Sequence, residues 1–144
     1  MVQEGRKKRV LVLCTGNSCR SQMAEGWIRD RLGSRWEVRS AGTRPMTAIH
    51  PLAFRAMAEA GVDISAGRPE NVGAYLDQPW DLVVTVCDGA REVCPVFPRG
   101  PEKLHVSFFD PSLVEGSDEE RMVHFRRVRD EIRDRLLPEV QERG

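Results

Sequence analysis

The sequence lacks any long hydrophobic run, because even the longest apolar segments, such as residues 10–13, contain only a few residues. A helix that crosses a bilayer needs roughly 20 apolar residues, so a transmembrane helix is excluded. The basic cluster at residues 6–9 faintly resembles the start of a signal peptide, but the apolar run after it is too short and lacks a small-residue cleavage site. We therefore expect a cytoplasmic protein without membrane contact.

Net charge is also lacking, since 22 basic residues balance 22 acidic ones. No overall field draws the chain to nucleic acid or to an anionic membrane, so any anion site must be local. A chain of 144 residues, 40% of them hydrophobic, predicts one domain over residues 1–144 that buries a core without disulfides or a structural metal. In a reducing cytosol its four cysteines remain thiols, available as nucleophiles, metal ligands or redox pairs.

Strands and helices alternate in the predicted secondary structure. The run at residues 10–13 is apolar at every position, as in a central parallel strand, whereas residues 36–40 alternate like an edge strand. Ser21 and Gly33 are expected to cap the first helix. We predict strands at 10–13, 36–40, 82–86 and 104–108, helices at 21–32, 49–60 and 122–140, and a loop at 65–78 with at most a short helix at 72–76. This order predicts a doubly wound α/β fold with a four-stranded parallel sheet and helices on both faces, which binds ligands beyond the carboxyl ends of its strands.

The loop after the first predicted strand contains only small and polar residues and leads into a helix. Its backbone N–H groups and the helix dipole can bind a tetrahedral oxyanion above Cys14, and the same field would lower the pKa of that thiol. The Arg20 guanidinium can hold two oxygens of the anion, and Ser21 can donate to the thiolate. A lone cysteine here would more often be a buried structural thiol, but the whole string favours a nucleophile. The predicted oxyanion loop consists of Thr15, Gly16, Asn17, Ser18, Cys19, Arg20 and Ser21.

Two further segments follow predicted strands. Asp110 stands before a proline after the fourth strand, where its carboxyl group could protonate a departing oxygen, although a plain Asp-Pro turn is the alternative. Cys87 and Cys94 follow the third strand and could be a redox pair, buried structural thiols or half of a zinc site. Zinc is disfavoured because no histidine shows ligand spacing. We therefore expect no metal and no cofactor.

This combination resembles the thioredoxin-coupled arsenate reductases of the low-molecular-weight protein tyrosine phosphatase superfamily. A tyrosine phosphatase of this superfamily usually carries aromatic residues after the Asp-Pro, where this chain has Ser112 and Leu113. The resemblance covers nearly the whole chain and rests on residues 14–26, 40–42, 61–65, 82–94, 110–111 and 125–132.

The resemblance implies a reaction. Cys14 attacks arsenic while Arg20 and the loop amides hold the oxyanion, and Asp110 protonates the leaving hydroxide. Arsenate is the substrate implied, with phosphate and sulfate as competing anions. A weak phosphatase activity is expected as well, because arsenate and phosphate are nearly isosteric.

The resemblance also implies a disulfide cascade. Cys87 attacks Cys14, arsenite departs, and Cys94 attacks Cys87 to leave a disulfide that thioredoxin or a similar dithiol protein reduces. We expect residues 87–97 to move in that step. No step is assigned to Cys19.

Some relatives of this kind bind potassium beside the loop, through residues that match Asn17, Glu25 and Ser40. Two further positions of that site hold Arg68 and Glu70 here, and a guanidinium opposes a bound cation. We therefore expect activity that does not depend on potassium.

Two other classes of function remain open from the sequence. One is a phosphatase that hydrolyses phosphotyrosine or small phosphate esters through Cys14 and Asp110. The other is a regulator that binds an oxyanion or a metalloid without catalysis.

Overall fold

Four parallel strands form the centre of the structure, a computed structural model that describes residues 6–144. They are β1 (Lys8–Cys14), β2 (Trp36–Gly42), β3 (Leu82–Thr85) and β4 (Glu102–His105). The order across the sheet is β2-β1-β3-β4, and every neighbouring pair is parallel. This confirms the predicted four-stranded parallel sheet, with β2 at an edge. The chain leaves β1 toward β2 and later returns to its other side as β3, so the order reverses between β1 and β3, where such folds bind ligands.

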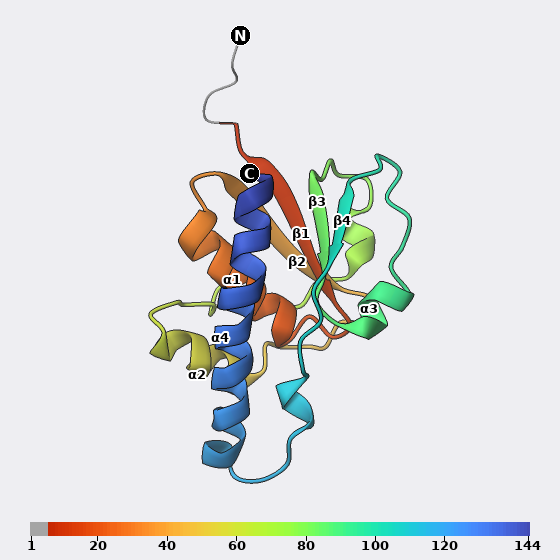
Figure 1. Ribbon diagram of the computed structural model, residues 1–144. Coiled ribbons are helices and arrows are strands. Elements are labelled where there is room, and N and C mark those ends of the chain that lie inside the picture. The colour runs from red at the N-terminus through yellow and green to blue at the C-terminus, as the bar shows by residue number, and fades with distance from the viewer. Residues whose placement is uncertain (1–5) are drawn as a thin grey trace.

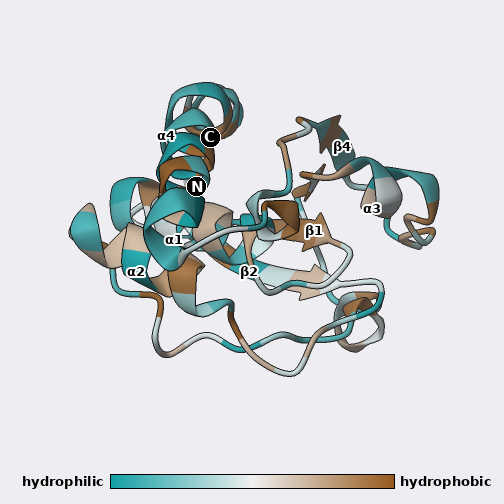
Figure 2. Cartoon of the chain, turned by 90° about the horizontal axis from the view of Figure 1, so that it is seen from below, coloured by the Kyte–Doolittle hydropathy of each residue, from teal (hydrophilic) through white to brown (hydrophobic). Residues whose placement is uncertain are grey.

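Helices cover both faces of this sheet, as predicted. They are α1 (Arg20–Leu32), α2 (Pro51–Glu59), α3 (Asp88–Glu92) and α4 (Asp118–Arg143). Figures 1 and 2 show α1, α2 and α4 together on one side of the strands, with α3 on the other. None of the helices formed by residues 6–144 combines the length and hydrophobicity needed to span a bilayer.

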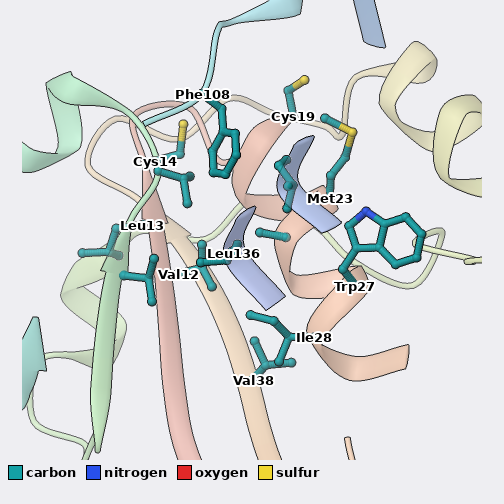
Figure 3. Close-up of a cluster of buried hydrophobic side chains, with 14 of the residues drawn as sticks. Val12, Leu13, Cys14, Cys19, Met23, Trp27, Ile28, Val38, Phe108 and Leu136 are labelled. Carbon is teal, nitrogen blue, oxygen red and sulfur yellow. The ribbon is translucent and has the colours of Figure 1, made fainter. Parts of the chain in front are cut away.

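The main core lies between the sheet and α1 and α4 (Figure 3). The predicted stripe of α4 is buried: Met122, Phe125, Val128, Ile132, Leu136 and Val140. The indole of Trp27 in α1 donates a hydrogen bond of 3.0 Å to the carbonyl of Arg129, which ties the two helices together. This core fixes α1 against β1, and hence the loop that joins them.

Three local predictions are corrected. Ser21 does not cap α1: it lies inside the helix, which begins at Arg20 with Cys19 as its N-cap residue. The fourth strand ends at His105 rather than at residue 108, because the chain then turns over the carboxyl edge of the sheet, although the amides of Val106 and Phe108 still bond to the third strand and its extension. The sequence also gave no sign of α3, since five residues are too few to show a helical period. The short helix expected near residue 72 is present as a 3₁₀ helix, Val72–Tyr75.

Gly42, the last residue of β2, lies against the loop that follows β1. A Cβ atom there would lie 2.5 Å from the carbonyl oxygen of Thr15. We expect Gly42→Ala to lower the free energy of unfolding by about 1–3 kcal/mol, because backbone must shift to admit the methyl group. Chemical denaturation measures this change.

Gly73→Ala is the control, since the added Cβ would approach only the Asn71 side chain, at 3.2 Å. Its effect should stay within about 0.5 kcal/mol. Equal unfolding free energies for the two variants would contradict the close approach at Gly42.

Candidate active site

The loop between β1 and α1 is fastened by its carbonyl oxygens. Four of them accept backbone hydrogen bonds of 2.8–3.2 Å: Cys14 from Thr43, Thr15 from Arg44, Gly16 from Met46 and Ser18 from His50. Within the described chain, the amides of residues 16–21 donate to no protein group. Residues 16–20 border a cavity of about 260 Å³ that is also lined by Cys14 and Asp110. A row of free N–H groups at a helix N-terminus is suited to an oxyanion.

Asn17 keeps the loop in shape. Its backbone has a left-handed φ of 51°, which asparagine tolerates better than most residues. Its fully buried side chain donates to the hydroxyls of Ser21 at 2.7 Å and Ser40 at 2.9 Å, and accepts from the amide of Glu70 at 2.9 Å. The side chain of Asn17 is therefore used within the protein, whereas the Ser21 hydroxyl, which accepts here, keeps its own proton as a donor.

Arg20 connects the loop to the segment that follows β4. Its Nη1 donates to the carbonyl of Phe108 at 3.1 Å, and its Nη2 lies 3.3 Å from a carboxylate oxygen of Asp110. Its Nε is buried without a hydrogen-bond partner. The other oxygen of Asp110 accepts from the amide and the hydroxyl of Ser112, at 3.0 and 2.6 Å. The structure thus brings Arg20 and Asp110 together beside Cys14, with one guanidinium donor still free for an anion.

The thiols of Cys14 and Cys87 are neighbours, and each shifts the pKa of the other. Cys14 ends β1 and Cys87 follows β3, so both lie at the carboxyl edge where the strand order reverses. The sulfur of Cys87 also lies 3.4 Å from the hydroxyl of Thr15 and accepts from the amide of Ala90 at 3.4 Å. The hydrogen bond from Cys14, together with those from Thr15 and Ala90, lowers the pKa of Cys87 to about 5.

Cys14 titrates in the opposite direction. Its pKa is raised, first because it hydrogen-bonds to Cys87 and second because its thiol is buried, and the lowering effect of Arg20 does not offset these. The sequence-based expectation of a lowered Cys14 pKa is therefore wrong for this state. The two thiols therefore titrate as a coupled pair, in which the neighbour favours ionisation of Cys87 and disfavours ionisation of Cys14.

Cys94 lies apart from this pair. It lines a second cavity, of about 280 Å³, together with Lys103 and His105. The five-residue helix α3 separates it from Cys87, and because a helix rises about 1.5 Å per residue, it holds the two cysteines apart at its opposite ends. Burial raises the pKa of Cys94. A bond between Cys87 and Cys94 therefore requires α3 to unwind.

Cys19 is the fourth thiol and is 5% exposed. Burial raises its pKa, and the charge of Asp110 raises it further. In Figure 3 it lies near Met23, at the end of the hydrophobic cluster that also holds Cys14. All four cysteines are free thiols in this structure.

Four cavity-lining residues were missed by the sequence analysis: Arg44, Met46, His50 and Ser112. The first three belong to an irregular segment after β2, where no periodic pattern marks them. His50 precedes Pro51 and caps α2 through its Nδ1, which accepts from the amide of Leu52 at 3.1 Å. A His-Pro pair before a helix was the one available signal. Burial lowers the pKa of His50, so its ring stays neutral at pH 7.

The residues that match a potassium site in some relatives are engaged with one another here. Ser40 donates to the carboxylate of Glu25, which forms an ion pair with Arg29. The adjoining cavity, of about 640 Å³, is also lined by Arg39 and Arg68. Among residues 6–144, no group of three or more His, Cys, Asp or Glu side chains could hold a metal ion. Guanidinium groups beside Glu25 leave this place unsuited to a cation.

The parallel sheet, its order and the cysteine loop before α1 define a phosphatase-like α/β protein. The family of low molecular weight phosphotyrosine protein phosphatases matches residues 9–142. The arsenate reductase of Halalkalibacterium halodurans is 50% identical over 130 residues, which cover 90% of this chain and 93% of that protein. The chain therefore belongs to this phosphatase family and, within it, to the arsenate reductases.

Solved structures are similar over almost the whole chain. An arsenate reductase in an oxidized state has a TM-score of 0.80 and 25% identity, over 95% of this chain and 99% of that one. The thioredoxin-dependent arsenate reductase of Corynebacterium glutamicum has a TM-score of 0.67 and 29% identity, over 98% of this chain and 65% of that one.

The thiol pair predicts a titration at low pH. We expect the ultraviolet absorbance of thiolate to show one group that ionises at about pH 5, the pKa of Cys87. In Cys14→Ala the donor to Cys87 is lost, so this pKa should rise toward the usual thiol value of about 8.5. Cys94→Ser, which leaves the pair intact, should not move it. A low-pH titration that persists in Cys87→Ala would contradict the assignment.

The ion pair beside Ser40 predicts indifference to potassium. We expect the same rate of arsenate reduction when potassium replaces sodium at constant ionic strength, because Arg29 already neutralises Glu25. Steady-state assays in the two salts measure this. A several-fold rise in turnover with potassium would refute it.

Proposed function

We propose that this protein reduces arsenate to arsenite by a disulfide cascade through Cys14, Cys87 and Cys94, and that thioredoxin or a similar dithiol protein restores the thiols. The observation that carries the proposal is that the pairing of β1 with β3 brings Cys87 to the loop of free amides, where its sulfur lies 3.4 Å from the hydroxyl of Thr15, the residue after Cys14. A hydrolase needs only the first of these thiols. The proposal places the protein in the cytoplasm, where dithiol proteins keep such cysteines reduced.

The first step is attack on arsenic. The amides of residues 16–21 and the free Nε of Arg20 bind the arsenate oxygens. Cys14 passes its proton to Cys87 and attacks, so that a sulfur–arsenic bond forms and an arsenic–oxygen bond breaks. Asp110, which lines the same cavity, donates a proton to the leaving hydroxide, which departs as water. Fixed donors around the anion stabilise the charge that develops in this step.

The second step is transfer of the oxidised state between sulfurs. Cys87 loses its proton and attacks the sulfur of Cys14, a disulfide forms, and the sulfur–arsenic electron pair leaves with arsenic as arsenite. The geometry favours this step because the two sulfurs already share a hydrogen bond. A pKa of about 5 for Cys87 means that its thiolate form is readily recovered at neutral pH.

The third step moves the disulfide to a position that the reductant can reach. Cys94 attacks Cys87, which frees the Cys14 thiolate and leaves a Cys87–Cys94 disulfide. Since α3 lies between these cysteines, its unwinding accompanies the bond. The segment also carries exposed apolar side chains on both sides of Cys94, with Val93 62% and Val96 82% exposed. A dithiol protein can reach a disulfide on such a surface segment by thiol exchange.

Phosphate ester hydrolysis is the second candidate activity. It uses the loop, Cys14, Arg20 and Asp110 but needs neither Cys87 nor Cys94 as a redox group. The similar size and charge of phosphate and arsenate favour it as a slow side reaction. The side chain after the Asp-Pro-Ser turn is Leu113, 73% exposed, in place of an aromatic ring that could hold a phenyl group. We therefore propose the reductase as the main activity.

Cys87→Ser separates the candidate functions. With arsenate and thioredoxin, multiple turnover should fall by at least about 100-fold, because the intermediate on Cys14 has no resolving thiol. Hydrolysis of p-nitrophenyl phosphate by the same variant is the internal control and should fall far less than arsenate reduction, because the ester reaction uses Cys87 only as a proton acceptor for Cys14. A wild-type protein that hydrolyses the ester but yields no arsenite is a phosphatase, and one that does neither is a binding protein.

Mass spectrometry of the wild-type protein tests the end point of the cascade. After anaerobic treatment with arsenate and no thioredoxin, we expect the loss of two hydrogens, mapped to a bond between Cys87 and Cys94. The same treatment with phosphate, which carries no oxidising equivalents, is the control. An unchanged mass after arsenate would contradict the cascade.

A further inference from the structure

A chain of hydrogen bonds joins α3 to the sheet. The hydroxyl of Thr85 in β3 lies 2.7 Å from Nδ1 of His105 in β4, and Nε2 of His105 lies 3.0 Å from a carboxylate oxygen of Asp88. The strand pairing sets this chain up, because Thr85 and His105 are register partners. Since the carboxylate can only accept, Nε2 donates to Asp88, and Nδ1 shares a hydrogen bond with the Thr85 hydroxyl. We call these three residues the α3 tether.

The tether holds the N-terminal end of α3, which adjoins Cys87. Asp88 is the first residue of α3 and directly follows Cys87. In the described part of the chain, the bond to His105 is the only hydrogen bond or ion pair between residues 88–92 and the rest of the fold beyond Cys87 and Val93. Gly89 lies close to the loop, with its Cβ position 2.8 Å from the Thr15 hydroxyl, but it forms no polar contact there. Apart from the burial of Ala90 in the core, the helix between Cys87 and Cys94 is therefore held to the fold by this one polar contact.

We infer that His105 is a positioning residue that stabilises the reduced form and thereby sets the reduction potential of the Cys87–Cys94 pair. This inference rests on the proposed cascade. The disulfide bridges the two ends of α3, so Asp88 leaves its helical position when the bond forms. An interaction present only in the dithiol form favours reduction of the disulfide by a reductant. Loss of the tether shifts the balance toward the disulfide and makes the potential more negative.

The test is an equilibrium between the protein and dithiothreitol buffers. In this exchange the reductant gives two electrons and two protons to the protein disulfide and becomes oxidised itself. The fraction of Cys87–Cys94 disulfide is read by alkylation of free thiols and peptide mass spectrometry. For His105→Leu we expect the equilibrium constant for reduction to fall about two- to fivefold, the worth of one partly exposed charged hydrogen bond. This corresponds to a potential about 9–20 mV more negative.

Matched variants show whether the tether itself is responsible. His105→Gln keeps a donor toward Asp88 and should restore most of the wild-type equilibrium. Asp88→Ala should shift the equilibrium as His105→Leu does, and the double variant should shift it no further, because both remove the same bond. Hydrolysis of p-nitrophenyl phosphate, which needs Cys14 but no α3 thiol, reports whether each variant is folded. If His105→Leu does not fold, Asp88→Ala and His105→Gln give the same comparison.

The possible results separate the role of His105 from the cascade itself. If the wild-type protein forms the disulfide and the tether variants have the same equilibrium constant with dithiothreitol, the role of His105 is overturned and the cascade stands. Variants that lose thermal stability and phosphatase rate without a shift in the equilibrium would show that His105 only supports β4. A wild-type protein that forms no Cys87–Cys94 disulfide would overturn both the cascade and this inference.

Discussion

The proposed chemistry of this protein depends on the contact between two sulfurs, one at the end of β1 and one after β3. This contact exists because the strands are parallel neighbours, paired from Val10 with Leu82 to Leu13 with Thr85. The carboxyl ends of both strands therefore lie at the same edge of the sheet. One proton shared by two buried thiols gives a nucleophile and an acceptor for its proton in a single contact. The surrounding loop then only has to hold an oxyanion over that contact.

The loop and the redox segment are built in opposite ways. The loop is fixed by backbone bonds to residues 43–50 and by the buried Asn17 side chain, so its amides are organised before an anion arrives. The redox segment is a short helix with few attachments, which suits a part that must unwind during each cycle. Cys87 connects the rigid loop to the weakly held helix, because its sulfur lies 3.4 Å from the Thr15 hydroxyl and it directly precedes α3.

The sequence was informative where local pattern determines structure. The apolar run of β1, the string from Cys14 to Ser21 and the stripe of α4 predicted the sheet, the loop and the main packing helix. It was misleading where a property depends on groups that are distant in the sequence. The pKa of Cys14 was expected from the helix dipole and Arg20, but the sulfur of Cys87, brought in by the β1–β3 pairing, outweighs both. Cys94 is separated from Cys87 by α3, a helix too short to show a periodic pattern of apolar residues in the sequence.

The central claim is that the oxidised state passes directly from Cys14 to Cys87. Single-turnover trapping with Cys94→Ser tests it most directly, since this variant can form the first disulfide but not the second. After anaerobic arsenate treatment, peptide mapping should find Cys14 bonded to Cys87 and one equivalent of arsenite released. Arsenite released with Cys87 still a free thiol, or a disulfide between Cys14 and Cys19, would contradict the account.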